Sequence, residues 1–518
     1  MSLKRHCLAL LVFLALAGAA YAQKHDDYFE AEDHRHGIKT LKPPPPPAHP
    51  EKTGMWTTLS VFMPINPVHM ALMNNGKVLV IAGSGNYPND TKKRYAGVFD
   101  PVDETIRTFT LQYDMFCNGM VILPDGRPFI MGGTKKYPPV WWQGLPDTSV
   151  FSPSSGTFTK MATMSGGRWY PTGTVLSDGT VMVISGLGEE GGINQTVQIY
   201  NAATDQWTAA GTGYPGMTLY PRQTLLPSGH VFSPAPTSQF YDPKTHVWTA
   251  GPKTKYGLTR NYGTAVLLPL TPSNQFTPTV MIFGGGTFLK GGTRITATTE
   301  TVDLSVKTPK WKWGPSMHKP RIDLNATILP NGQVLVSGGS SVGEDAPSAV
   351  LGSEIYDPVA KTLKRAASME FPRLYHSNTL LLPDGRVLAA GSNPQRGTYE
   401  PHIEVYSPAY LFNSDGTPAT RPVITSVSSP LSYGGSFQIT TPDPASIRSV
   451  VLIRPGAPTH AFDMEQRLVE LDFTAGNGVL NATAPATSSL APPGYYLLFI
   501  VNRAGVPSVA QFVLLPVQ

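Results

Sequence analysis

A short turn-and-strand motif recurs along this chain about every fifty residues, and no other feature constrains the fold so strongly. Each copy is a tight turn on Asp-Gly, Asn-Gly or Ser-Gly followed by an apolar run, as in "LPDGRPFIMGG" (123–133). Such turns need the positive φ angles that glycine adopts readily. Six copies keep the turn glycine, at Gly76, Gly126, Gly179, Gly229, Gly332 and Gly385. The interval of 103 residues before Gly332 holds two periods, because the fifth copy, "PTVMIFGGG" (278–286), lacks the turn glycine. We therefore recognise seven units.

A second motif follows the first at the same period. It is an aromatic residue before a turn, as in "FDP" (99–101), "FSP" (151–153), "YDP" (356–358) and "YSP" (406–408). Two independent motifs on one period near fifty residues are typical of kelch repeats. A single four-stranded unit cannot bury both of its faces, so the units must pack against one another in a ring. The sequence predicts an all-β protein with a seven-bladed kelch-type β-propeller over residues 53–417.

The segments on either side of the repeats differ from them in composition. Residues 1–22 have a basic start, an apolar centre and the small-residue end "AYA", which predicts a secretory signal peptide. Residues 23–52 are charged and then proline-rich, which predicts an extended tether. Residues 418–518 contain alternating apolar runs separated by Gly and Pro turns, and they predict a C-terminal immunoglobulin-like β-sandwich.

Composition limits the partners of the protein. The 50 glycines, 50 prolines and only 14% charged residues favour a turn-rich β protein. The net charge of +5 is spread without a basic cluster, which argues against nucleic-acid binding. Beyond the signal, no apolar stretch reaches the roughly 18 residues of a membrane span. We expect a monomer that is secreted, whether extracellular or periplasmic.

The mature chain carries a single cysteine. Cys7 is removed with the signal peptide, so Cys117 has no partner for an intramolecular disulfide. A leftover cysteine in a secreted protein indicates intermolecular pairing or special chemistry. The alternative is a buried thiol that packs as a small apolar group.

The repeat places Cys117 relative to other polar residues. Counting back nine residues from the turn glycines gives the start of the innermost strands, at Cys117, Tyr170, Tyr220, Asp323 and His376. Equivalent positions on innermost strands form a ring around the channel of a propeller. Cys117 and Tyr170 lie on adjacent blades, so their side chains should approach one another. Tyrosine and histidine converging on a channel form a plausible copper site. Ordinary polar lining that holds water is the alternative.

Four motifs carry a resemblance to a known family. They are "MFCNG" with Cys117, "RWYPT" with Tyr170, "RLYHSNTLLLPDGRV" with Tyr375 and His376, and "THAFDMEQR" with His460. Together they resemble the copper radical oxidases, which include galactose oxidase and glyoxal oxidase. The resemblance covers residues 53–518 and keeps the motifs in order.

The resemblance implies a cofactor and a role for each motif residue. One copper ion would be bound by Tyr170, Tyr375, His376 and His460. Tyr170 would be joined to Cys117 by a thioether and hold a tyrosyl radical, and Tyr375 would accept the hydroxyl proton of the substrate. His460 would be carried by a loop of the sandwich. The implied reaction oxidises small aldehydes or primary alcohols and reduces O2 to H2O2.

Within the family, the sequence favours the glyoxal oxidase-like branch. Galactose oxidase stacks a tryptophan over the thioether, whereas the matching stretch here, "SGLGEEGG" (185–192), has glycine. Trp169, Trp141 and Trp142 are alternatives for that aromatic neighbour, although core packing explains them equally well. Arg168 is interpreted either as a substrate-orienting residue or as part of a salt bridge between blades. Tyr220 and Asp323 are weaker candidates for the pocket lining.

Three other functions compete with this prediction. One is a galactose oxidase-type carbohydrate alcohol oxidase. Another is a non-enzymatic kelch propeller that serves as a binding module. The third is an oxidase whose peroxide cross-links a cell wall or matrix, with extracellular polysaccharide as a partner. A scaffold has no reason to keep Cys117, Tyr170, Tyr375, His376 and His460 together, and this set discriminates the enzyme from the binding module.

Overall fold

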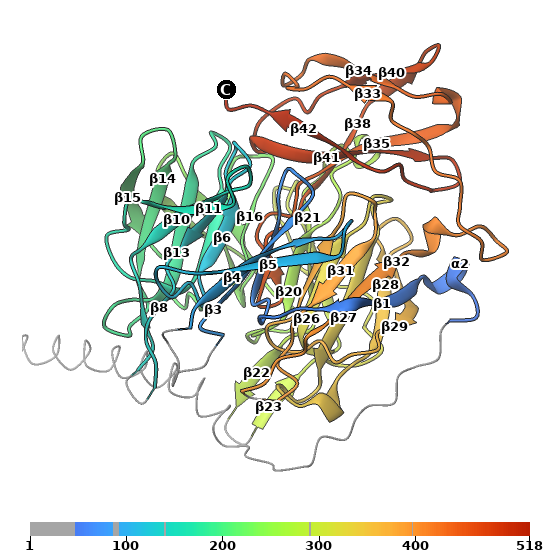
Figure 1. Cartoon of the computed structure of the whole chain (residues 1–518). Coiled ribbons are helices and arrows are strands. Elements are labelled where there is room, and N and C mark those ends of the chain that lie inside the picture. Colours follow the sequence, from blue (N-terminus) through green and yellow to red (C-terminus); the bar gives the residue numbers. More distant parts are fainter. Residues whose placement is uncertain (1–46, 86–92, 139–140, 290–291, 396) are drawn as a thin grey trace, which may run out of the picture.

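The computed structural model describes residues 47–85, 93–138, 141–289, 292–395 and 397–518 (Figure 1). The expected signal peptide and nearly all of the expected tether lie outside these residues. The described end of the tether is not extended throughout, because Pro50–Thr53 form the short helix α2, with proline at its first position. No helix in the described part of the chain is long and apolar enough to cross a membrane.

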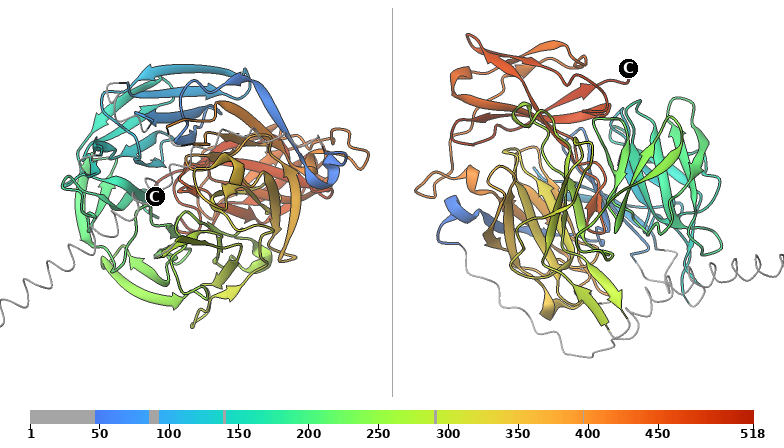
Figure 2. Two further views of the ribbon diagram at one scale, coloured as in Figure 1. Left: turned by 90° about the horizontal axis from the view of Figure 1, so that it is seen from below. Right: turned by 180° about the vertical axis from the view of Figure 1, so that it is seen from behind.

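The predicted all-β fold is confirmed. Within the described residues, seven antiparallel sheets, here called blades, surround a central axis (Figure 2). Blade 1 contains β2 (His69–Leu72), β3 (Val78–Gly83), β4 (Tyr95–Asp100) and β5 (Thr105–Thr110), and blade 2 contains β6 (Gly119–Ile122), β7 (Pro128–Met131), β10 (Thr148–Ser152) and β11 (Thr157–Met161). Blade 3 contains β12 (Trp169–Val175), β13 (Val181–Leu187), β14 (Thr196–Asn201) and β15 (Gln206–Thr212), and blade 4 contains β16 (Thr224–Leu225), β17 (Val231–Ser233), β18 (Thr237–Asp242) and β19 (Val247–Lys253).

The remaining blades complete the ring. Blade 5 contains β20 (Thr264–Leu267), β21 (Thr279–Phe283), β24 (Thr299–Asp303) and β25 (Lys312–Trp313), and blade 6 contains β26 (Ile322–Ile328), β27 (Val334–Ser340), β28 (Gly352–Asp357) and β29 (Thr362–Ser368). Blade 7 contains β30 (Asn378–Leu381), β31 (Val387–Ala390) and β32 (His402–Ser407), and its outermost strand is β1 (Met55–Phe62) from the start of the ring. This pairing of the first strand with the last blade closes the propeller.

The second unit is a sandwich of two four-stranded sheets (Figure 1). One sheet contains β33 (Ser426–Val427), β34 (Ser436–Thr440), β40 (Val479–Thr483) and β39 (Phe473–Ala475), and the other contains β38 (Leu468–Leu471), β35 (Ile447–Ile453), β41 (Gly494–Asn502) and β42 (Gln511–Leu515). The small hairpins are β8 (Thr134–Lys136) with β9 (Gln143–Gly144), β22 (Gly286–Leu289) with β23 (Gly292–Ile295), and β36 (Pro458–Thr459) with β37 (Phe462–Asp463). Short 3-10 helices lie at Pro272–Asn274, Ala346–Ser348, Ala409–Leu411 and Pro444–Ser446.

Burial explains the strand composition. The inner strands β2, β3, β6, β7 and β12 are buried along their whole length, as expected for strands covered on both faces. The outermost strand β5 is largely exposed. The apolar core therefore lies between the blades, toward the axis.

The Gly-Gly pairs that end the second strands form contacts between blades. The N–H of Gly339 donates to the carbonyl of Arg373 in the next blade, and a Cβ on Gly338 would lie 2.7 Å from the same carbonyl oxygen. Gly133 makes the equivalent bond to Arg168, at 3.0 Å. Glycine at these positions allows neighbouring backbones to approach, which gives the repeated motif a structural cause.

A buried arginine precedes the inner strand in four blades. In blades 5, 6 and 7 it pairs with a buried glutamate on the third strand, at 2.7–2.8 Å: Arg260 with Glu300, Arg321 with Glu354, and Arg373 with Glu404. Arg168 is the member in blade 3, where its guanidinium donates to Ser185 O, Thr196 O and Gln198 Oε1. Both expectations for Arg168 are wrong, because these partners belong to its own blade and fix it inside the sheet.

Candidate copper site

The ring positions share an uncommon backbone conformation. The equivalent residues that form the ring around the channel have positive φ: Cys117 (59°), Tyr170 (68°), Tyr220 (42°), Tyr262 (54°), Asp323 (57°) and His376 (63°). Positive φ is rare and strained for residues other than glycine, and such strain gathers at functional sites. Tyr262 was missed by the sequence analysis because the fifth repeat has no turn glycine from which to count.

Backbone hydrogen bonds link the ring positions from blade to blade. The N–H of Tyr170 donates to the carbonyl of Cys117 at 2.9 Å, and the N–H of Tyr220 donates to that of Tyr170 at 3.0 Å. Asp323 and Tyr262 repeat the bond at 2.8 Å. Cys117 and Tyr170 are therefore backbone neighbours on adjacent blades, as predicted from their equivalent positions in the repeat.

A group of three potential metal ligands lies at the centre of the ring. Ligand atoms of Cys117, His376 and His460 lie within 4.8 Å of one another, and all three residues are buried. The Cys117 Sγ atom is 3.8 Å from Nε2 of His460, and the two imidazole ring centres are 4.6 Å apart. Two imidazoles and a sulfur so close together in the interior are typical of a metal centre.

Hydrogen bonding determines which nitrogen of each imidazole faces the group. His376 Nδ1 is 2.6 Å from the Asn393 amide oxygen, and that amide is held by its Nδ2 donating to Thr398 O at 2.6 Å. An amide oxygen only accepts, so Nδ1 of His376 must carry the proton. Its Nε2 keeps a lone pair, and it has no hydrogen-bond partner in the described structure. A buried, unpaired imidazole nitrogen fits a metal ligand.

His460 is oriented in the same way by Thr459. Its Nδ1 is 2.6 Å from Thr459 Oγ1, which donates its own proton to Val68 O at 2.9 Å. The threonine oxygen must then accept from Nδ1, so Nε2 of His460 is free to bind a metal.

Both imidazoles are held neutral. Burial lowers the pKa of His376 to about 3. Burial also lowers the pKa of His460 well below its usual value, with further lowering by His376, His69 and Arg222. A neutral imidazole is the form that binds metal.

The two candidate tyrosines lie against the imidazoles. The ring centre of Tyr170 is 4.6 Å from that of His460, and Tyr375 is 3.9 Å from His376 and 5.2 Å from His460. Tyr170 and Tyr375 are 5% and 8% exposed. The structure thus brings all five predicted site residues together. Imidazole nitrogens and phenolate oxygens are a donor set that suits copper.

A small cavity of about 20 Å³ opens beside Tyr170. It is lined by Tyr170, Thr218, Leu219, Tyr220, Arg222, Asn261, Tyr262 and His460. The hydroxyl of Tyr220 is fixed by donating to Asn118 O at 2.6 Å. Asp323 occupies the ring with both carboxyl oxygens buried, and burial raises its pKa well above the usual range, opposed by the charge of Arg222.

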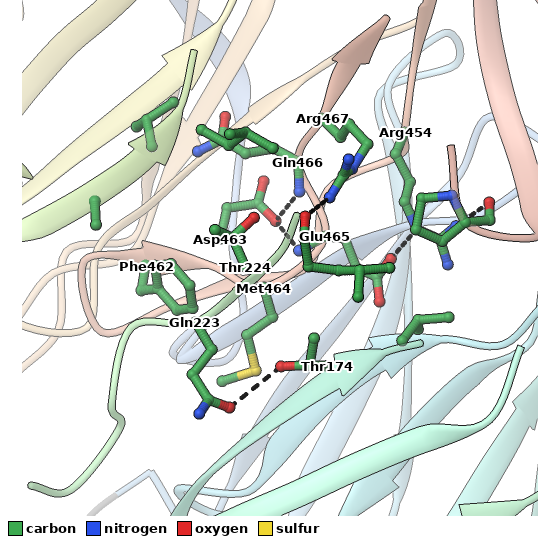
Figure 3. Close-up of a pocket in the computed structure, with 16 residues that line it drawn as sticks. Thr174, Gln223, Thr224, Arg454, Phe462, Asp463, Met464, Glu465, Gln466 and Arg467 are labelled. Atoms are coloured by element: carbon green, nitrogen blue, oxygen red, sulfur yellow. Dashed lines mark hydrogen bonds and ion pairs between the residues drawn. The ribbon is translucent and has the colours of Figure 1, made fainter. Parts of the chain in front are cut away.

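His460 reaches the channel on the hairpin β36–β37 of the sandwich. This hairpin extends the sheet of blade 1, with Thr459 opposite His69 on β2. The loop that follows is held by Asp463, whose Oδ1 accepts the N–H groups of Ala457 and Glu465 at 2.9 and 3.0 Å, and by the ion pair between Glu465 and Arg454 (Figure 3). This loop also borders a cavity of about 40 Å³, and residues that line the cavity are drawn in Figure 3. The sandwich is thereby fixed to the propeller at the site.

The three tryptophans occupy different places. The ring centre of Trp169 is 3.8 Å from that of Tyr170, and Trp142 stacks on Trp169 at 4.6 Å. Trp141 instead donates its indole N–H to Gly191 O at 3.1 Å. Trp169 is therefore the tryptophan in contact with Tyr170, and Trp142 lies one ring further out.

A propeller whose channel collects imidazoles, phenols and a thiol, completed by a residue from a sandwich, defines the class of the chain. The family described as "Glyoxal oxidase N-terminus" matches residues 92–410 and the one described as "Galactose oxidase-like, Early set domain" matches residues 421–515. The chain belongs to the glyoxal oxidase family, within the copper radical oxidases.

Named relatives agree with this assignment. The chain is 28% identical to galactose oxidase of Gibberella zeae over 495 residues, covering 88% of this chain and 70% of the relative. It is 30% identical to aldehyde oxidase GLOX of Vitis pseudoreticulata over 466 residues, covering 80% and 84%. A fungal alcohol oxidase solved in complex with copper superposes with a TM-score of 0.79 at 26% identity, covering 90% of this chain and 100% of that one.

Proposed function

We propose that this protein is a secreted mononuclear copper radical oxidase that oxidises small aldehydes or primary alcohols and reduces O2 to H2O2. The observation that carries the proposal is the buried group of Cys117, His376 and His460, with Tyr170 and Tyr375 packed against it. The relatives named galactose oxidase and aldehyde oxidase, and the copper-bound alcohol oxidase, support it.

In this proposal Tyr170, Tyr375, His376 and His460 hold one copper ion, and Cys117 is joined to Tyr170. The thioether forms when a carbon–sulfur bond replaces the S–H of Cys117 and a ring C–H of Tyr170, and O2 takes the two electrons and two protons released. Bound copper supplies one of the two one-electron stores that a two-electron oxidation needs, and the substituted tyrosine is the other.

The chain's own residues then move the protons. Tyr375 accepts the hydroxyl proton of the substrate, and the Tyr170 radical takes a hydrogen atom from the carbon that carries this hydroxyl. The substrate carbon becomes a carbonyl carbon, and O2 takes up the two electrons and two protons to form H2O2. An aldehyde enters the same cycle as its hydrate, which has the required hydroxyl.

The remaining assignments extend the proposal. We assign residues 1–22 to a signal peptide, 23–52 to a tether, 53–417 to the propeller and 418–518 to the sandwich. We infer a monomer that acts outside the cytoplasm on a small aldehyde or alcohol and O2, with cell-wall or extracellular polysaccharide as a partner. The contact of Trp169 with Tyr170, together with glycine at residues 191 and 192, supports a branch other than that of galactose oxidase.

The test combines mass and turnover. Mature protein treated with copper and O2 is expected to lose the mass of two hydrogen atoms and the titratable thiol of Cys117. It should then release peroxide with one or more of glyoxal, methylglyoxal, glycolaldehyde, galactose and simple alcohols. Cys117→Ser is the matched control and should show neither change. An unchanged mass with a free thiol would overturn the proposal, and the ranking of substrates decides between aldehyde and carbohydrate oxidation.

A further inference from the structure

Four aromatic rings form a continuous chain that begins at Tyr170. The ring centres of Tyr170 and Trp169 are 3.8 Å apart, those of Trp169 and Trp142 are 4.6 Å apart, and those of Trp142 and Tyr137 are 4.8 Å apart. Trp169 and Trp142 are nearly parallel, with 18° between their planes. Each ring therefore lies in van der Waals range of the next.

The far end of the chain is a hydrogen-bonded phenol. The hydroxyl of Tyr137 donates to Asp114 Oδ2 at 2.6 Å and also contacts Ser84 Oγ. The other carboxyl oxygen of Asp114 is occupied by the N–H groups of Ser84 and Phe116, at 2.9 and 3.0 Å. The carboxylate is thus held with Oδ2 facing Tyr137. It is a fixed proton acceptor for that phenol.

The outer end of the chain lies near the surface. Tyr137 is 9% exposed, and the two tryptophans are buried to a similar degree, with Trp142 4% and Trp169 7% exposed. Tyr137 directly follows β8, where Lys135 and Lys136 are exposed. The route from Tyr170 thus ends at a buried phenol next in sequence to the exposed Lys136, and a small oxidant at this surface would lie beside the outer end of the chain of rings.

Packing alone does not account for the two tryptophans. The indole N–H groups of Trp142 and Trp169 are buried and have no hydrogen-bond partner in the described structure. A buried tryptophan N–H normally finds an acceptor, and leaving it unpaired costs free energy. Phenylalanine would fill similar space without that cost. Indole differs from phenylalanine in losing an electron far more easily.

We propose that Tyr137, Trp142 and Trp169 form an electron-transfer relay through which a one-electron oxidant outside the protein converts Tyr170 to its radical. The relay rests on the proposed function, because it needs Tyr170 to be the radical residue. The oxidant is a one-electron acceptor of the metal-complex class, such as hexachloroiridate(IV) or hexacyanoferrate(III).

The electron and proton balance closes over one cycle. The oxidant takes one electron from Tyr137, whose phenol proton moves to Asp114 Oδ2. Trp142 then reduces Tyr137, the proton returns from Asp114 to the phenol, and Trp169 reduces Trp142. Finally Tyr170, which as a copper ligand would be a phenolate with no proton to lose, reduces Trp169 and is left as the neutral radical. The net change is one electron from Tyr170 to the oxidant, with every relay residue restored.

The test is the rate at which the radical forms, measured apart from turnover. Copper-loaded, cross-linked protein is reduced and mixed with hexachloroiridate(IV), and the visible absorption of the radical is followed in a stopped-flow instrument. Trp142→Phe keeps an aromatic ring but removes the oxidisable indole from the centre of the chain, and it should slow radical formation by at least about tenfold, a barrier increase of roughly 1.4 kcal/mol. Trp141→Phe removes the neighbouring tryptophan outside the chain and should leave the rate unchanged.

A second variant examines the proton acceptor. Tyr137→Phe keeps the ring but removes the phenol, so the rate should fall and lose the solvent deuterium isotope effect seen with the wild-type protein. Equal rates for wild-type, Trp142→Phe and Trp141→Phe proteins would overturn the relay while leaving the proposed function intact. A wild-type protein that develops no radical absorption would overturn both.

Discussion

The imidazole of His460, which the sandwich carries, is oriented by the propeller. Its Nδ1 lies 2.6 Å from the hydroxyl of Thr459, and that hydroxyl donates to the carbonyl of Val68 at 2.9 Å. Val68 immediately precedes β2 of blade 1, so the tautomer of a candidate ligand depends on contact between the two units. Thr459 Oγ1 is therefore a point where folding of the interface and assembly of the site are coupled.

Loss of the Thr459 hydroxyl should weaken copper binding. In Thr459→Val, Nδ1 of His460 loses its acceptor and the ring loses its fixed orientation, while the shape of the side chain is kept. Removal of such a partner typically lowers metal affinity by about 10–100-fold. Thr459→Ser keeps the hydroxyl and should retain wild-type affinity. Titration against a copper chelator measures both, and equal affinities for the two variants would contradict the coupling.

A missing glutamate in blade 3 offers a stabilising change. Arg168 is bound by Gln198, whereas the equivalent arginines of blades 5, 6 and 7 have glutamate, and burial lowers the pKa of Arg168 to about 9. Gln198→Glu should raise the free energy of unfolding by roughly 1 kcal/mol, because a charge-assisted bond replaces a neutral one.

The control for this change is the equivalent glutamine of blade 4. Gln239 occupies the same register position on β18, and its amide donates to Thr237 O. Gln239→Glu introduces the same charge without a buried arginine and should not stabilise. Chemical denaturation of both variants measures the effect, and equal changes would show that the arginine is not the cause.

The Gly-Gly contact between blades should be intolerant of a side chain. Gly338 and Gly229 both have positive φ, 67° and 87°, but a Cβ on Gly338 would lie 2.7 Å from Arg373 O of the next blade, whereas a Cβ on Gly229 meets nothing within 4 Å. Gly338→Ala should therefore cost roughly 1–3 kcal/mol more than Gly229→Ala, since backbone strain is common to both and only Gly338 adds a clash. Similar unfolding midpoints for the two variants would show that the blade backbones can separate to admit a methyl group.

The sequence predicts the parts of this molecule that depend on local signals. The turn glycines and apolar runs specify each blade, and their period aligned Cys117, Tyr170 and His376 correctly on the ring. Tyr262 escaped because its repeat lacks the turn glycine, although its backbone has the same positive φ. Counting residues from the turn glycine fails in any repeat that lacks this glycine.

Contacts between distant segments were beyond the sequence. The partners of the imidazoles, Thr459 and Asn393, are ordinary polar residues whose role appears only when the hairpin of the sandwich and the loop after β31 enter the channel. Arg168 was misread for the same reason, because its acceptors on β13 and β14 are defined by strand pairing. The sequence therefore indicates which residues can bind the metal, whereas the orientation of their side chains depends on tertiary contacts.

Buried neutral imidazoles should make the metal-free protein sensitive to acid. Burial lowers the pKa of His69, His376 and His460, that of His376 to about 3. Below the usual histidine pKa near 6.5 the unfolded chain binds protons that the folded chain does not, so the free energy of unfolding falls as the pH falls toward 3. An imidazole whose pKa is lowered in this way contributes up to about 1.4 kcal/mol per pH unit between its folded and unfolded pKa values.

His69 allows this effect to be measured without removing a proposed ligand. Both of its ring nitrogens lack hydrogen-bond partners in the described structure, so His69→Leu breaks no hydrogen bond there. The variant should lose less stability between about pH 6 and 4 than the wild-type protein, by up to about 1.4 kcal/mol per pH unit. His246→Asn, at an exposed position with positive φ that asparagine tolerates, should keep the wild-type dependence.

Urea denaturation of the metal-free proteins across this pH range gives the dependence of the free energy of unfolding on pH for each variant. Comparing variants cancels the opposing contribution of buried acids such as Asp323, which is the same in all of them. Identical slopes for wild-type and His69→Leu proteins would mean that His69 already binds its proton in the folded state.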